Sequence, residues 1–297
     1  MVLARVGGRY AIWSDGRVWD AVLRGRMKHR RAETVLVGDR VVLANVADPP
    51  ATIESVLPRR SLLQRRSPGR ARGERAVAAN LDQVVVVGAA RKPDWDPFLM
   101  DRFTAVAEAN HLPVSVVINK GDLAPEAATL GEPYRQAGYG VLVTSVVSGA
   151  GIVELRLLLG AHVSLFTGPT GVGKSSLLNA LVPGLRLRTG DVSPRSHAGR
   201  HTTVAAEMHP CLDGGFVVDT PGLRDIGLWG LRPQDVSEAF PDVRRHGADC
   251  RFDNCRHCEE PRCAVRGAVE AGMLASSRYG SYRKMLEEAE AAARPWA

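Results

Sequence analysis

One glycine-rich segment, Gly168-Pro169-Thr170-Gly171-Val172-Gly173-Lys174-Ser175, constrains the fold of this chain more than any other feature. It follows an apolar run at residues 163–167 that predicts a buried strand, and it opens a helical pattern over residues 174–181. In this context the glycines let backbone N–H groups surround phosphates, and the helix N-terminus adds positive potential. We expect Lys174 to reach the β- and γ-phosphates and Ser175 to bind Mg²⁺. The strand and the helix disfavour the alternative, a glycine-rich turn with a chance lysine.

The pattern around this loop predicts a doubly wound α/β domain. Apolar runs rich in β-branched residues occur at residues 82–87, 114–118 and 141–144, and helical patterns separate them. Leu99, Phe103 and Val106, for example, recur at helical spacing. Two further strands, at residues 204–209 and 216–219, are expected to form a hairpin at one edge of the sheet.

A second motif indicates which base accompanies the phosphates. Asn119-Lys120-Gly121-Asp122 follows the predicted strand at residues 114–118 and has the Asn-Lys-x-Asp form of a guanine-recognition element. Asp122 can accept hydrogen bonds from N1–H and the exocyclic amine of guanine, whereas adenine would leave this carboxylate unpaired. We expect the Lys120 stem to cover the base and Asn119 to tie this loop to the phosphate loop. Thr144-Ser145 fits the short motif whose backbone meets guanine O6.

Two motifs that follow the phosphate loop resemble switches that sense the γ-phosphate. Asp219-Thr220-Pro221-Gly222 has the Asp-x-x-Gly form, in which Asp219 holds Mg²⁺ through water and the Gly222 N–H senses the γ-phosphate; the alternative is a plain turn. Gly199-Arg200-His201-Thr202-Thr203 stands where the first switch belongs. We favour Thr203 over Thr202 as the magnesium ligand.

Leu223 stands where many GTPases place a glutamine that orients the attacking water. A leucine cannot hydrogen-bond water, so either hydrolysis is slow or another residue assists. His201 is the candidate within the motif set, and the equally weighted alternative is a surface loop histidine.

The order of the motifs is itself informative. The base-recognition elements at residues 119–122 and 144–145 precede the phosphate loop and the switches, which reverses the usual order. The same sheet forms if the chain is circularly permuted. The second switch then leads directly toward the C-terminal segment, so nucleotide state can act on that segment through the chain.

The N-terminal quarter predicts a small, basic β-barrel. Short strands are expected at residues 10–13, 18–22, 40–46 and 52–57, and Ser14-Asp15-Gly16 is a hairpin turn signal. Residues 1–75 contain 16 Arg or Lys and 7 Asp or Glu, a net charge of +9. This charge suits a polyanion such as nucleic acid better than a merely solvated surface. The Arg-, Pro- and Gly-rich residues 58–76 are interpreted as a linker or a phosphate-contacting arm.

Four of the five cysteines lie within residues 250–263, which indicates a metal site rather than disulfides. Cys250, Cys255, His257 and Cys263 supply three thiolates and one imidazole, a set that suits tetrahedral structural zinc. Cys258 is a fifth candidate, but it directly follows His257, so one of the two is expected to point away. A charged helix with few apolar anchors is predicted at residues 277–293.

The composition, with 24% charged and 45% hydrophobic residues, is typical of a globular protein. The sequence contains neither a signal-peptide-like start nor a stretch long enough to span a bilayer. We therefore expect a soluble, cytoplasmic protein with no membrane partner. We also expect a monomer.

Together these features resemble ribosome small subunit-dependent GTPase A, a family of circularly permuted bacterial GTPases that act in late maturation of the small ribosomal subunit. The resemblance covers nearly the whole chain. It implies GTP hydrolysis stimulated by the small subunit, with rRNA, GTP and GDP as partners, Mg²⁺ and one Zn²⁺ as cofactors, and His201 as the catalytic residue. The expected domains are an OB-fold-like barrel (1–60), a basic linker (61–78), a permuted P-loop GTPase domain (79–240) and a zinc-binding, mainly helical domain (241–297).

The expected site residues fall into three groups. GTP is assigned to Asn119, Lys120, Asp122, Thr144, Ser145, Gly168, Pro169, Thr170, Gly171, Val172, Gly173, Lys174, Ser175, Ser176 and Gly222. Magnesium is assigned to Ser175, Thr203 and Asp219, and zinc to Cys250, Cys255, His257 and Cys263.

Two other functions fit part of the pattern. A permuted GTPase acting on the large subunit would share the motif order, although this zinc spacing behind a basic barrel is not expected there. A GTP-gated rRNA-binding module with little turnover is compatible with Leu223. GTP turnover with and without ribosomal subunits separates these functions.

Overall fold

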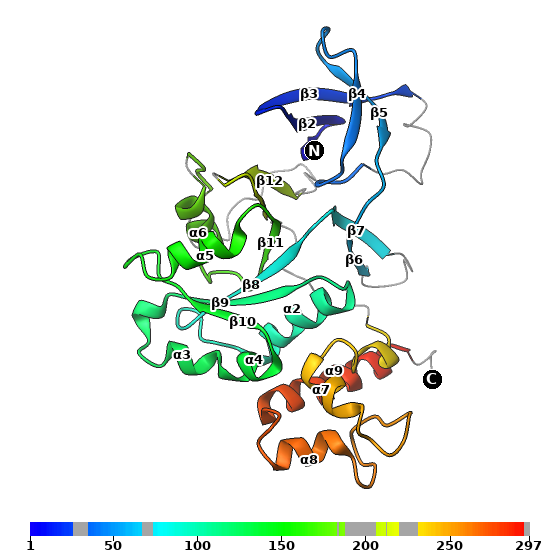
Figure 1. Cartoon of the computed structure of the whole chain (residues 1–297), viewed down its shortest axis with the longest axis vertical. Coiled ribbons are helices and arrows are strands. Elements are labelled where there is room, and N and C mark those ends of the chain that lie inside the picture. The colour runs from blue at the N-terminus through cyan, green and yellow to red at the C-terminus, as the bar shows by residue number, and fades with distance from the viewer. Residues whose placement is uncertain are drawn as a thin grey trace, which may run out of the picture.

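The computed structural model describes residues 1–25, 35–66, 74–182, 184–187, 206–211, 213–219 and 231–293. Figure 1 shows a small β-structure at the top, a sheet with helices in the middle and a group of helices at the bottom. Within these residues, no helix has both the length and the apolar character that crossing a membrane requires.

The N-terminal unit is a five-stranded sheet with the strand order β1-β2-β3-β5-β4. The Val2 N–H donates to the Asp39 carbonyl over 2.9 Å, and the Gly38 N–H donates to the Val2 carbonyl over 2.9 Å, so the chain before β4 returns to β1. The predicted small barrel is therefore confirmed, and β1 is an additional strand. Its elements are β1 (Val2–Val6), β2 (Arg9–Ser14), β3 (Arg17–Leu23), β4 (Val41–Ala44) and β5 (Ala51–Val56).

The region predicted to be a linker contains an antiparallel hairpin, formed by β6 (Leu62–Arg66) and β7 (Glu74–Ala79). Its base is apolar, because Leu63 and Ala78 are buried in the same core as the central sheet. The arginines of this region dominated the sequence pattern and hid these apolar positions. Asn80, which directly follows β7, joins the end of the hairpin to the N-terminal unit, because its amide donates to the Gly38 carbonyl over 2.9 Å.

The central sheet confirms the predicted doubly wound α/β fold. Its strand order is β10-β9-β8-β11-β13-β12, in which only the edge strand β12 pairs antiparallel among the described strands. Every residue of β8 and of β11 is buried, as expected for inner parallel strands. The strands are β8 (Gln83–Ala89), β9 (Val114–Asn119), β10 (Gly140–Val143), β11 (Val163–Thr167), β12 (Glu207–Pro210) and β13 (Phe216–Asp219).

Helices cover both faces of this sheet (Figure 1). Successive valines of β8 point to opposite faces, so Val84 packs with Phe103 on the α2 side, whereas Val85 packs with Leu177 on the α5 and α6 side. The helices are α2 (Pro97–Ala109), η1 (Gly121–Leu123), α3 (Ala127–Leu130), α4 (Glu132–Ala137), α5 (Ile152–Leu159) and α6 (Lys174–Leu181).

The C-terminal unit is mainly helical over its described residues, as predicted. It has its own core, which includes Phe240, Val243, Val265 and Tyr282. Its longest helix packs along α2 of the central domain (Figure 1). The elements are η3 (Pro233–Asp235), α7 (Pro241–Gly247), α8 (Ala264–Glu270) and α9 (Ser276–Ala293).

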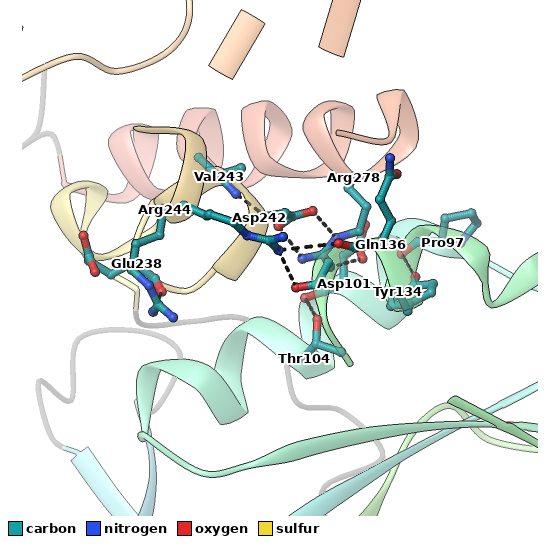
Figure 2. Close-up of polar contacts among 12 residues, drawn as sticks. Pro97, Asp101, Thr104, Tyr134, Gln136, Glu238, Asp242, Val243, Arg244 and Arg278 are labelled. Atoms are coloured by element: carbon teal, nitrogen blue, oxygen red, sulfur yellow. Dashed lines mark hydrogen bonds and ion pairs between the residues drawn. The ribbon is translucent and has the colours of Figure 1, made fainter. Parts of the chain in front are cut away.

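A buried guanidinium joins the C-terminal unit to the central domain (Figure 2). Arg278 of α9, 1% exposed, donates from Nη1 to Asp101 of α2 over 2.7 Å and from Nε and Nη2 to Asp242 of α7 over 2.9 and 2.8 Å. Burial lowers the pKa of Arg278, but the two carboxylates raise that pKa well above its ordinary value, so the guanidinium stays charged. Burial also raises the pKa of Asp101, an effect that Arg278 opposes. Nothing in the sequence pattern indicated this network.

Candidate nucleotide site and metal centre

The phosphate-loop segment lies between β11 and α6, at the carboxyl edge of the sheet. Two of its glycines are required by close contacts at positive φ. A Cβ on Gly168, where φ is 138°, would lie 2.0 Å from the Val87 carbonyl oxygen. A Cβ on Gly173, where φ is 94°, would lie 2.4 Å from Nδ2 of Asn119. The loop can therefore close against its neighbours only with glycine at these positions.

The first turn of α6 carries the polar residues of this loop. Lys174 begins the helix, and its ammonium donates to the carbonyls of Gly168 and Pro169 over 2.7 and 2.6 Å. Ser175 and Ser176 follow it and are half-buried. A helix N-terminus beside a glycine-rich loop supplies N–H donors and positive potential, which suits an anion such as a phosphate chain.

Asn119 joins the guanine-motif loop to the phosphate loop. It is the last residue of β9 and is 2% exposed. Its Nδ2 donates to the Val172 carbonyl over 2.9 Å, and its Oδ1 accepts from Oγ1 of the fully buried Thr144 over 3.1 Å. The side chain of one residue thus connects the loops after β9, β10 and β11, as expected for Asn119.

Lys120 forms a second connection between these loops. It adopts a left-handed conformation with φ of 59°, and its ammonium donates to the Gly171 carbonyl over 2.7 Å and to the Lys92 carbonyl. Lys92 lies in the loop between β8 and α2, which the sequence did not link to the site because a backbone carbonyl has no sequence signature.

The other two residues assigned to the base lie nearby in sequence but differ in exposure. Asp122 lies in η1 and is exposed, whereas Ser145 is buried and its N–H donates to the Ala150 carbonyl.

Asp219 is the last residue of β13 and lies beside Phe166 of β11, two residues before Gly168. The Asp-x-x-Gly motif therefore starts next to the phosphate loop. The other switch residues of the sequence analysis, namely His201, Thr202, Thr203, Gly222 and Leu223, lie outside the described residues.

The topology of the sheet points to the same place. From β8 the strand order runs one way through β9 to β10 and the other way through β11 to β13, so the order reverses between β8 and β11. Ligands of such sheets bind at the carboxyl ends of the strands near that point.

A second cluster, in the C-terminal unit, has the chemistry of a metal centre. One ligand atom from each of Cys250, Cys255, His257 and Cys263 lies within 4.8 Å of all the others. The Sγ atoms of Cys250 and Cys263 are 3.9 Å apart, and each lies 3.5 Å from Nδ1 of His257. Tetrahedral zinc, with Zn–S bonds of about 2.3 Å and Zn–N bonds of about 2.0 Å, requires about 3.8 Å between sulfurs and about 3.5 Å from sulfur to nitrogen. The spacing of Cys250, His257 and Cys263 therefore fits a zinc ion, and Cys255 lies close enough to supply the fourth ligand.

Cys258 is not a member of this cluster, because its thiol donates to the Arg256 carbonyl over 3.3 Å. Two tyrosines of α9, which the sequence analysis did not identify, hold the ligand loop. The Tyr279 hydroxyl donates to the His257 carbonyl over 2.7 Å, and the Tyr282 hydroxyl donates to the Arg256 carbonyl over 2.9 Å. Such contacts orient the ligands of a metal site.

Comparisons with known proteins identify similar sequences and structures over almost the whole chain. A profile of the family described as RsgA GTPase matches residues 56–229. The chain is 48% identical to the small ribosomal subunit biogenesis GTPase RsgA of Gemmatimonas aurantiaca, over 97% of this chain and 96% of that protein. It is 44% identical to the protein of the same name from Moorella thermoacetica, with the same coverage.

Two solved structures have the same fold. The crystal structure of YjeQ from Thermotoga maritima superposes with a TM-score of 0.82 at 33% identity, covering 99% of this chain and 98% of that one. The structure of YloQ, described as a circularly permuted GTPase, superposes with a TM-score of 0.76 at 28% identity and covers 99% and 96% of the two chains.

Proposed function

Because this chain belongs to the RsgA GTPase family, we propose that it hydrolyses GTP as an assembly factor of the small ribosomal subunit. The relatives named for small-subunit biogenesis favour this function over a role on the large subunit. The likeness to a circularly permuted GTPase accounts for the motif order, in which the base elements precede the phosphate loop.

The contact between Asn119 and Val172 carries the proposal. Its 2.9 Å hydrogen bond places the end of β9, where a guanine-binding carboxylate would follow, against the phosphate loop. A nucleotide held by both loops meets N–H donors at its phosphates and Asp122 at its base. The Asp122 carboxylate favours guanine, because adenine has no N–H at position 1 and no 2-amino group.

The role of each residue follows from its chemistry. The GTP ligands are the fifteen residues assigned above. Ser175, Thr203 and Asp219 hold Mg²⁺, which neutralises charge that develops on the phosphates. His201 orients or deprotonates the attacking water in place of the glutamine that Leu223 replaces.

The cluster of Cys250, Cys255, His257 and Cys263 holds one Zn²⁺ per chain in a closed, structural site. This metal stabilises the loop between α7 and α8 and takes no part in the reaction. The fit of the ligand distances to a tetrahedron supports zinc.

The barrel makes phosphate contacts with rRNA. Arg5, Arg9, Arg17 and Arg24 are exposed on it, and residues 1–75 carry a net charge of +9. We propose domains at residues 1–60, 79–240 and 241–297, with the β6–β7 hairpin in the segment between the first two. The chain acts as a monomer in the cytoplasm, where small subunits are assembled.

GTP turnover with and without purified small and large ribosomal subunits tests the function. Only small subunits should raise the rate, and an equal response to large subunits would contradict the proposal. Asp122→Asn tests the base, because an amide suits the 2-oxo group of xanthine. This variant should lose affinity for GTP and gain affinity for xanthosine triphosphate, and tight ATP binding by the unaltered protein would contradict the assignment.

A further inference from the structure

The N-terminal barrel lies against the β12–β13 hairpin of the central sheet. Leu3 of β1 is buried in one hydrophobic cluster with Met208 of β12 and Val218 of β13. In the same cluster, Trp13 of β2 and Phe216 of β13 meet edge to face, with ring centroids 6.4 Å apart and an interplanar angle of 81°. The barrel therefore covers a face of the hairpin.

The alternation of β2 explains why Trp13 takes this position. Ile12 points into the barrel core, where it is 1% exposed, so its neighbour Trp13 points outward. The outward face is the one that meets the hairpin. Trp19 of β3 lies elsewhere on the barrel, packed against the barrel core with the Arg17 guanidinium 3.8 Å from its ring centroid.

The hairpin connects the two switch motifs directly along the chain. The first motif ends at Thr203, four residues before β12 begins, and the second begins at Asp219, the last residue of β13. In the hairpin, Met208 pairs with Val218, and Glu207 pairs with Asp219. A shift of this hairpin therefore moves Asp219, the first residue of the second switch motif.

We infer that Trp13 and Phe216 are positioning residues, through which the barrel sets the β12–β13 hairpin and links small-subunit binding to the state of the nucleotide. This inference rests on the proposed function. A subunit that binds the barrel in one orientation favours one hairpin position, and a γ-phosphate that engages Asp219 and the switches also favours one position. When the two positions coincide, each ligand strengthens the binding of the other by the same factor.

The test uses the full chain and measures small-subunit affinity with a non-hydrolysable GTP analogue and with GDP. The ratio of the two dissociation constants reports the linkage, which for coupled sites is typically on the order of 5- to 150-fold. An edge-to-face pair contributes roughly two- to tenfold to an equilibrium constant beyond its buried area. Trp13→Ala should therefore move the ratio toward one by roughly threefold or more. Phe216→Leu, which retains apolar volume, should move it in the same direction while preserving the fold.

Trp19→Ala is the matched control, because it removes an indole from the same barrel away from the hairpin. It should change both affinities alike and keep the wild-type ratio. A wild-type ratio in Trp13→Ala and Phe216→Leu would overturn the inference, as would a ratio of one in the unaltered protein. Failure of the unaltered protein to bind small subunits at all would instead overturn the proposed function.

Discussion

Replacing Asn119 with alanine should disconnect the guanine loop from the phosphate loop. The change removes two hydrogen bonds, one to the Val172 carbonyl at 2.9 Å and one from the Thr144 hydroxyl at 3.1 Å. Both Asn119 and Thr144 are buried, at 2% and 0% exposure, so water does not readily replace the lost partners. We expect the free protein to relax into loop arrangements that bind nucleotide poorly.

The magnitude follows from these two bonds. Each contributes about 0.5–1.5 kcal/mol, and a buried polar group left without a partner costs about 1–3 kcal/mol. A combined loss of about 2–4 kcal/mol corresponds to a roughly 30- to 700-fold larger dissociation constant for GTP. GDP affinity should fall by a similar factor, because the lost contacts position the loops and do not touch the γ-phosphate.

Titration calorimetry with GTP and GDP is the assay. Thr144→Val is the matched control, because it removes the hydroxyl that bonds to Asn119 but leaves the bond between Asn119 and Val172. Its affinity should fall less than that of Asn119→Ala, by roughly 5- to 140-fold, because one bond is lost and the buried Oδ1 of Asn119 is left without its partner at a cost of about 1–3 kcal/mol. An Asn119→Ala protein that is folded and binds GTP within threefold of the unaltered protein would refute this account of the site.

Three further predictions concern the metal, the domain contact and the reaction. Cys255→Ser should lose its zinc whereas Cys258→Ser should retain one ion per chain, and elemental analysis with the opposite result would reassign the ligands. Arg278→Met leaves two buried carboxylates without their cation, at a cost of about 3–5 kcal/mol. Amide exchange in α9 should accelerate by roughly 100- to 4,000-fold, and unchanged protection would contradict this. His201→Ala should lower single-turnover hydrolysis on saturating small subunits by roughly 10²- to 10⁴-fold. It should bind GTP normally, and full stimulation would place the catalytic group elsewhere.

The sequence by itself determined those parts of the protein that depend on local pattern. Apolar runs with flanking glycines located β8, β9, β11 and α6 to within a few residues. The motifs on the ends of these strands predicted which loops would meet, because the carboxyl ends of parallel strands share one edge. The spacing of Cys250, Cys255, His257 and Cys263 predicted a four-ligand cluster, since short-range spacing limits how far apart these ligands can lie.

Only the tertiary structure decided the contacts between segments far apart in sequence. Arg278 belongs to a helix that the sequence predicts to be charged with few apolar anchors, and it is buried because Asp101, 177 residues away, and Asp242 lie opposite it. The hairpin of β6 and β7 and the contact between Trp13 and Phe216 depend in the same way on partners that local periodicity does not specify. The physical reason is that a charge is buried only where a partner offsets its loss of hydration, and an indole leaves water only where another surface covers it, and the fold supplies both partners.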